Sequence, residues 1–212
     1  MLSAEKIQEN WKKHGKIIKT SLNPERVEKV SQMYADFGEE VVLAPASSKE
    51  SFHNAFPGGY IDHVNRVVEC TYALAKTWKK AGIELDFTDE ELFFSALFHD
   101  LGKLGKKDLP NFLPQTNDWR KKNLQENYTQ NPDLDFMLIQ DRSIFILQSY
   151  SIQISQKEFL AIKIHDGLYD ETNKPYLISY NPDARLKTNL PLILHQGDLL
   201  ATKIEQQRHS TK

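Results

Sequence analysis

The sequence predicts an all-α fold in the form of an orthogonal bundle of about six or seven helices joined by long loops. Apolar residues recur every three or four positions over most of the 212-residue chain, which is the spacing of amphipathic helices. Two capping boxes, at residues 88–91 and 155–158, mark helix starts. Segments typical of strands are few and short. With 40% hydrophobic residues, the chain can form one well-cored domain.

The first two helices are predicted to form a pair over residues 1–38 that packs on the core. The first helix covers residues 4–20. Asn23 and Pro24 then supply an N-cap and a proline at the first helical position of the second helix. Gly38 ends that helix, because glycine is the usual residue where a helix stops.

The main domain is predicted over residues 39–205. Residues 39–60 have the composition of a loop, with one brief extended piece at Val41-Val42-Leu43. A helix follows over residues 60–80. The first capping box begins another helix, which runs to about residue 101 and has Gly102 as its C-cap.

Residues 103–133 are polar and irregular, as in a functional lid or a poorly ordered loop. A further loop is predicted over residues 168–188, with a small hairpin around residues 176–180 as one interpretation. The remaining helices are expected over residues 134–150, 155–164 and 191–204. The polar tail, residues 206–212, is predicted to be frayed.

Composition excludes several classes of protein. The net charge of −2 provides no global basic field of the kind that marks nucleic-acid binders. Cys70 is the single cysteine, so neither a disulfide framework nor a cysteine-based zinc site can be built. Residues 1–10 lack the apolar segment of a signal peptide, and no run approaches the roughly 20 apolar residues of a membrane span. We expect a soluble cytoplasmic protein with no membrane partner.

Histidine and aspartate are the residues that point to chemistry. Of seven histidines, His14 and His209 have polar, terminal surroundings and are predicted to be solvated. Five others lie on apolar helical faces or beside glycine turns: His53, His63, His99, His165 and His195. A lone histidine of this kind usually bonds a carbonyl in the core. That interpretation weakens for the set, because three predicted helices carry a histidine and an aspartate together, as His99-Asp100, His165-Asp166, and His195 with Asp198.

Imidazole and carboxylate without thiolate suit Mn²⁺, Mg²⁺, Fe²⁺, Co²⁺, Ni²⁺ or Zn²⁺. His63 adds a nitrogen on the buried face of its predicted helix. Neighbours such as His99 and Asp100 diverge by about 100° on a regular helix. A metal ion bound by both should therefore lie near the helix end, which the following Gly102 favours.

The order of these residues resembles a known superfamily. His63, then His99-Asp100, then Asp198 is similar to the H…HD…D pattern of the HD-domain metal-dependent phosphohydrolases. Within it, several segments resemble a branch that includes the YhaM-like 3′–5′ exoribonucleases and related phage and bacterial HD proteins. The run Phe98-His99-Asp100-Leu101-Gly102-Lys103 is similar to the central motif of the superfamily. The segments that resemble the narrower branch are Pro45-Ala46-Ser47, His53-Asn54-Ala55-Phe56, Gly58-Gly59-Tyr60-Ile61-Asp62-His63 and Ala161-Ile162-Lys163-Ile164-His165-Asp166-Gly167.

The resemblance implies His63, His99, Asp100 and Asp198 as metal ligands. It also implies Lys103 as a positive partner of a phosphate oxygen, and His165 as a residue facing a second metal or the scissile phosphate. His195 matches a histidine that precedes the last aspartate, and His53 matches one on the substrate-side loop. Asp100, Lys103 and His165 are therefore the expected catalytic residues. Arg142 is equally compatible with a phosphate ligand and with a surface ion pair.

One departure from the family concerns the number of ions. Relatives with two metals often carry a further His-Gly pair before the position of His165, and here residues 138–143 contain no histidine. A single ion is therefore favoured, with a second ion, held by His165 and substrate oxygens, as the alternative.

The resemblance implies hydrolysis of a phosphoester of a nucleotide or short oligonucleotide by a metal-activated water. One alternative is a 3′–5′ exonuclease on single-stranded RNA or DNA, and the Trp119-Arg120-Lys121-Lys122 segment is compatible with either a nucleic-acid contact or a solvated loop. A second alternative is a nucleotide-sensing module without turnover. The expected partner is a small phosphorylated molecule, and the sequence leaves the oligomeric state open.

Overall fold

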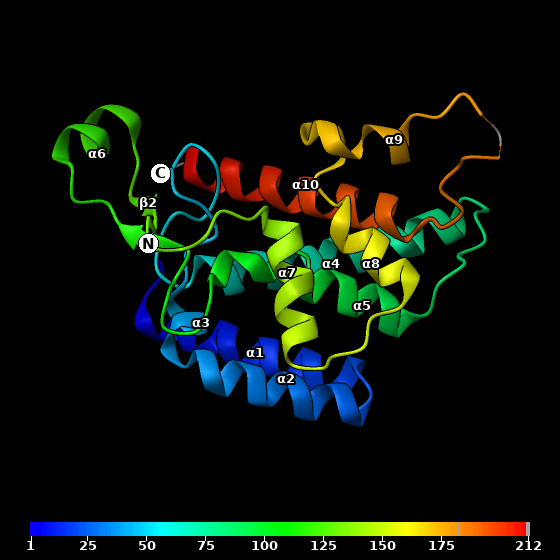
Figure 1. Cartoon of the computed structure of the whole chain (residues 1–212), viewed down its shortest axis with the longest axis horizontal. Helices are drawn as coiled ribbons and strands as arrows, with labels where there is room; N and C mark the ends of the chain where they lie inside the picture. Colours follow the sequence, from blue (N-terminus) through cyan, green and yellow to red (C-terminus); the bar gives the residue numbers. More distant parts are fainter. Residues whose placement is uncertain (182, 211–212) are drawn as a thin grey trace.

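The structure, a computed structural model, describes residues 1–181 and 183–210, and this part of the chain confirms the all-α class (Figure 1). Its ten α-helices are α1 (Ala4–Ser21), α2 (Pro24–Phe37), α3 (Glu39–Leu43), α4 (Gly59–Lys80), α5 (Asp89–Phe98), α6 (Asp118–Leu124), α7 (Ile139–Ser149), α8 (Gln156–Lys163), α9 (Lys174–Leu177) and α10 (Leu190–Ser210). Between them lie three short 3₁₀ helices and two strands, namely η1 (Leu101–Leu104), η2 (Gly167–Tyr169), η3 (Glu171–Asn173), β1 (Phe112–Pro114) and β2 (Tyr128–Gln130).

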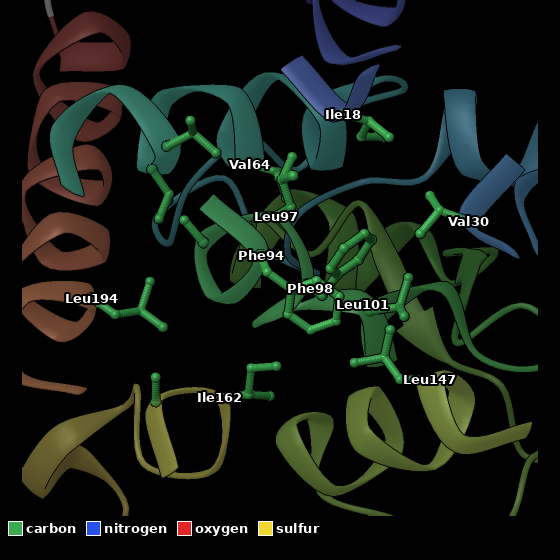
Figure 2. Packing of buried hydrophobic residues seen from close by; sticks show 14 of the residues in the cluster. Ile18, Val30, Val64, Phe94, Leu97, Phe98, Leu101, Leu147, Ile162 and Leu194 are labelled. Carbon is green, nitrogen blue, oxygen red and sulfur yellow. The ribbon is translucent and has the colours of Figure 1, made fainter. Parts of the chain in front are cut away.

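The core is organised around α5. This helix buries nearly all of its apolar side chains, and it packs against α1, α4, α8 and α10. Figure 2 shows Phe94, Leu97 and Phe98 surrounded by apolar side chains from other helices, including Val64, Leu147, Ile162 and Leu194. Full burial of each such side chain contributes about 1.5–3 kcal/mol. Apolar contacts with several other helices therefore fix the position of the C-terminal end of α5.

The N-terminal pair forms as predicted and lies along one side of the molecule (Figure 1). The Asn23 side chain accepts a hydrogen bond from the backbone N–H of Arg26, and Pro24 occupies the first turn of α2. Gly38 ends α2 with a φ of 60°, a conformation that glycine adopts without strain. Helix α1 packs on α4 and α5, and α2 contributes Val30, Met33 and Phe37 to the buried core.

Three internal segments differ from the sequence prediction. Residues 41–43 are helical within α3 rather than extended. The irregular stretch 103–133 contains α6 and the antiparallel pair β1–β2, whose strands have three residues each. Strands so short show no alternation, and α6 buries no residue, so neither leaves an apolar pattern. The hairpin considered around residues 176–180 is wrong, because α9 extends to Leu177 and irregular chain with a bend at Tyr180 follows it.

At the C-terminal end, α10 extends to Ser210, so residues 206–210 are helical where the sequence predicts a frayed tail. Residues 211–212 lie outside the described part of the chain. Among the described residues, no helix is both long and apolar enough to cross a lipid bilayer.

His14 corrects the sequence prediction, since it is fully buried between α1, α2 and α4 rather than solvated. Its Nδ1–H donates to Asn65 Oδ1 at 3.0 Å, and its Nε2 accepts from the Tyr34 hydroxyl at 3.0 Å. Burial lowers the pKa of His14 from 6.5 to about 4, and the bond to Asn65 offsets only part of this effect. The side chain of His209 lies outside the part of the chain that the structure describes.

This burial predicts a pH-dependent stability. The pKa of His14 is about 4 in the folded chain and 6.5 when unperturbed, so the unfolded chain binds the proton first as pH falls. His14 should therefore reduce the free energy of unfolding by about 1.4 kcal/mol per pH unit between about pH 6.5 and 4. Urea unfolding of wild type and His14→Gln across this range measures the effect. Equal pH slopes for the two proteins would contradict it.

Candidate metal centre

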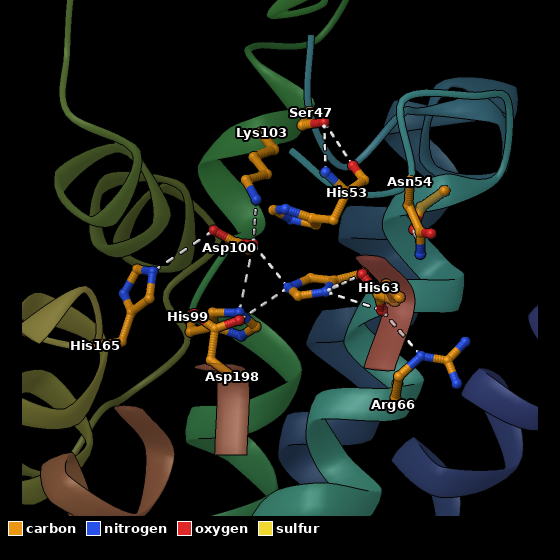
Figure 3. Close-up of polar contacts among 12 residues, drawn as sticks. Ser47, His53, Asn54, His63, Arg66, His99, Asp100, Lys103, His165 and Asp198 are labelled. Carbon is orange, nitrogen blue, oxygen red and sulfur yellow. Dashed lines mark hydrogen bonds and ion pairs between the residues drawn. The ribbon is translucent and has the colours of Figure 1, made fainter. Parts of the chain in front are cut away.

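Histidine and aspartate side chains from four helices, or from the turns that follow them, converge beside the end of α5 (Figure 3). His63 comes from α4, His99 and Asp100 from the end of α5, His165 from the turn after α8, and Asp198 from α10. Among the described residues, three groups have ligand atoms that all lie within 4.8 Å of one another: His63 with His99 and Asp198, His99 with Asp100 and His165, and His53 with His63 and Glu205. The chain thus contains buried histidine and aspartate groups that could hold a metal ion.

The backbone at the end of α5 explains how two neighbouring side chains reach one centre. His99 still has helical angles, but Asp100 has φ −103° and ψ 13° and leads into the 3₁₀ helix η1. The regular helix therefore ends between them, and the divergence of neighbouring side chains no longer applies. This agrees with the expectation that the centre lies at a helix end.

Gly102 is not the C-cap that the sequence predicts, because it lies inside η1. Its function is close packing against α7. A Cβ at this position would lie 2.2 Å from the carbonyl oxygen of Ile139. The Gly102 N–H donates to Ser143 Oγ at 2.8 Å, and the Ser143 hydroxyl lies 2.9 Å from the carbonyl oxygen of His99. Helix α7 thereby holds the turn that carries His99 and Asp100.

The histidine rings are oriented through their Nδ1 atoms. His99 Nδ1–H donates to the carbonyl oxygen of Ala96 at 2.9 Å, and His165 Nδ1–H donates to that of Ile162 at 2.8 Å. These bonds select the tautomer whose Nε2 carries a lone pair. The Nε2 atoms of both rings point towards Asp100, at 3.4 and 3.6 Å from its carboxylate oxygens. Such outer hydrogen bonds typically orient histidines that bind metals.

Glu205 orients His63 and is the residue that sequence reasoning missed. It is buried in α10, and its carboxylate oxygens lie 3.2 Å from His63 Nδ1. Arg66 Nε in turn donates to Glu205 at 3.0 Å, and Arg66 Nη2 donates to Asp62 at 2.7 Å. The sequence signal that could have identified Glu205 is its spacing from Asp198. Glu205 follows Asp198 by two helical turns and therefore lies on the same face of α10.

The opposite nitrogen of His63 faces two carboxylates. His63 Nε2 lies 3.2 Å from Asp198 Oδ1 and 3.4 Å from Asp100 Oδ2. Within the described residues, neither His63 Nε2 nor His99 Nε2 makes a hydrogen bond, although both are buried. Burying an unsatisfied polar atom is costly. A cation shared by these nitrogens and carboxylates would satisfy them together, so the residues fit a metal ion.

The charges around the cluster also favour a cation. With neutral imidazoles, the connected side chains that are buried or largely covered comprise four carboxylates and two cations: Asp62, Asp100, Asp198, Glu205, Arg66 and Lys103. This leaves two negative charges, which one divalent ion would balance. Burial disfavours the charged form of Asp100, but Lys103 and His99 outweigh it and hold the Asp100 pKa well below its usual value.

The same excess of negative charge raises the pKa of two histidines in the cluster. Burial opposes a charge on His63, yet Glu205 and the two aspartates raise the His63 pKa well above its usual value. Burial likewise opposes a charge on His165, but Asp166 and Asp100 raise its pKa to about 9. A metal ion competes with these protons for the same nitrogens, so binding should release protons.

The remaining predicted residues divide into those near the cluster and those away from it. The ring of His53 lies 4.6 Å from that of His63, centroid to centroid, and Ser47 Oγ donates to its backbone carbonyl. His195 Nδ1–H donates to the carbonyl oxygen of His165 at 2.7 Å, so it supports the His165 turn. Arg142 does not join the cluster, since it lines a separate cavity.

The cluster opens into a cavity of about 460 Å³. The wall at the cluster is formed by His53, Asp100, Lys103, His165 and Asp198. The outer wall comes from the start of α7 and from the segment around η2 and η3, and it includes Asp166, Asp170 and Glu171. A volume of this size suits a small-molecule ligand.

The fold and the cluster together define an all-α protein with a buried histidine–aspartate centre beside a ligand-sized cavity. Comparison with models of known protein families, with curated proteins and with solved structures finds no match for the chain.

The contact between η1 and α7 predicts opposite effects for two glycine substitutions. Gly102→Ala should destabilise the protein by about 1–3 kcal/mol, because the new methyl group would overlap the Ile139 carbonyl oxygen. Gly15→Ala in α1 is the matched control, since nothing lies within 4 Å of its added Cβ. It should stabilise by about 0.5–1 kcal/mol through helix propensity. Thermal or urea unfolding measures both, and equal effects would refute the close contact.

The bond between Glu205 and His63 predicts a weaker metal site on substitution. Glu205→Gln removes the charge that orients His63, so affinity for Mn²⁺ should fall by about 10–100-fold. Isothermal titration calorimetry measures this change. Glu28→Gln, at an exposed position of α2, should leave the affinity unchanged. Equal affinities for both variants would remove Glu205 from the centre.

Proposed function

We propose that this protein is an HD-type metal-dependent phosphohydrolase that hydrolyses a phosphoester of a nucleotide or short oligonucleotide. One observation carries the proposal. Four residues in the order H…HD…D come from three separate helices, yet their ligand atoms meet beside a cavity of about 460 Å³. The resemblance in sequence order includes these four residues, and so does the cluster of side chains in space, which also contains His53, His165 and Glu205.

In this proposal His63, His99, Asp100 and Asp198 hold one divalent ion: Mn²⁺, Mg²⁺, Fe²⁺, Co²⁺, Ni²⁺ or Zn²⁺. When bound, such an ion polarises a phosphoryl oxygen and lowers the pKa of water. A second ion near Asp100 and His165 is the alternative, and its protein ligands would be fewer.

The residues of the cavity wall supply the remaining functions. The Lys103 ammonium lies 2.5 Å from Asp100 Oδ2 and would neutralise charge on a phosphate oxygen. His165, held through Nδ1, presents Nε2 on the other side of Asp100 and would donate to the phosphate when protonated. Asp100 would orient the attacking water and accept its proton. His53 also lines this wall and would contact the substrate.

The outer wall favours a compact substrate over a long strand. Asp166, Asp170 and Glu171 line it, and their carboxylates repel a continuous phosphate backbone. A nucleotide with one or a few phosphates at Lys103 leaves this wall free of phosphate. We therefore prefer a small nucleotide to the single-stranded nucleic acid of the exonuclease alternative.

A substrate panel tests the function. With Mn²⁺, purified protein should release phosphate or a nucleotide from at least one of the nucleoside mono- and triphosphates, cyclic dinucleotides and a labelled oligonucleotide. Asp100→Ala should reduce this rate by at least about a hundredfold, since it removes a ligand and a proton acceptor. Asp118→Ala, whose side chain is 98% exposed, is the matched control and should retain full activity.

The same panel separates the alternatives. Stepwise shortening of the oligonucleotide with no action on small nucleotides would establish the exonuclease instead. Bound metal without any turnover would favour the sensing module. Circular dichroism of Asp100→Ala must retain the helical signal, and full activity in that folded variant would overturn the assignment of the centre.

A further inference from the structure

A second cavity of about 460 Å³ lies against a different face of α7 and shares no lining residue with the cavity of the metal centre. It is bounded by the end of α2, the turn after η1 and the segment before α7. The side chains that matter for its chemistry are Phe37, Lys107, Met137, Arg142, Phe145 and Tyr150.

Arg142 is an unusual cation in this cavity. It is only 6% exposed, and its Nη2 donates to the backbone carbonyl oxygen of Asp135 at 2.6 Å. Its Nε is buried without a hydrogen-bond partner among the described residues. Burial lowers the pKa of its guanidinium, and the negative charge of Asp135 offsets only part of this effect. A buried cation without a paired anion is costly.

Comparison with the two other arginines that are largely covered shows that Arg142 lacks a carboxylate partner. Arg26 forms ion pairs with Glu158 and Glu90, and Arg66 forms them with Asp62 and Glu205. Within the described part of the chain, Arg142 has a carbonyl oxygen as its partner but no carboxylate. The anion that would complete its environment is therefore not supplied by these residues.

The other side chains that line the cavity indicate which chemical groups such an anion would have besides its charge. Phe37, Met137 and Tyr150 provide apolar and aromatic surface, and Phe145 is 55% exposed at the edge. Lys106 and Lys107 also line the cavity and are exposed, so positive charge exceeds the single charge of Asp135. Apolar walls around a small number of polar groups are typical of ligand sites.

We propose that this second cavity binds a small amphipathic anion, with its acidic head on Arg142 and its apolar body against Phe37, Met137 and Phe145. The head is a carboxylate, sulfonate or phosphate group, since all three accept hydrogen bonds from a guanidinium. The site is separate from the proposed hydrolytic centre and does not depend on that function.

The dye 1-anilinonaphthalene-8-sulfonate is a suitable probe, because it joins an aromatic body to a sulfonate. Its fluorescence with the full chain should saturate at one dye per protein. Arg142→Gln should weaken binding at least tenfold, and Arg142→Lys should weaken it less. The neutral analogue N-phenyl-1-naphthylamine should bind Arg142→Gln and wild type equally, because it has no head for the guanidinium.

Arg185→Gln is the matched control, since Arg185 is exposed and lines another cavity, next to Lys157 and Lys187. It should leave the dye affinity unchanged. Should Arg142→Gln fail to fold by circular dichroism, Phe145→Asp and Lys107→Glu at exposed positions provide the test, each with at least threefold weaker binding. No saturable binding to wild type, unchanged affinity in the folded cavity variants, or a loss through Arg185→Gln would overturn the proposal.

Discussion

The contacts of carboxylates with both ring nitrogens of His63 are the constraint on which the candidate metal centre depends. Glu205 holds one ring nitrogen, while Asp100 and Asp198 face the other. These contacts join α4, the end of α5 and α10 through one imidazole. Three carboxylates around one buried ring are stable only with compensating positive charge, whether protons or a metal ion. The same ring therefore links the packing of three helices to the chemistry of the site.

Precision at the centre comes from helix ends that are held on several sides. Helix α5 ends within the core, where Leu97, Phe98 and Leu101 are fully buried. Helix α7 then fixes the following turn through Ser143, which bonds both the Gly102 N–H and the His99 carbonyl. Side chains placed on rigid elements with supported hydrogen bonds keep their geometry.

Local sequence patterns predicted the helices with strong stripes and caps, and they predicted the candidate ligands on those helices. They failed where the deciding contact is distant. His14 has lysines as sequence neighbours, yet it shares a helical face with Asn10 and Ile18 and meets Tyr34 and Asn65. The strands β1 and β2 are stabilised by each other rather than by an apolar pattern of their own.

By itself the sequence determined the all-α class, the capping boxes that begin α5 and α8, and the histidine and aspartate residues able to bind metal, because helix propensity, capping and residue chemistry act locally. The tertiary structure alone decided that Glu205 supports His63, that His195 supports the His165 turn, and that Arg142 faces a second cavity. These outcomes depend on which helix faces lie together in space, and that arrangement follows from packing of the whole core rather than from any single segment.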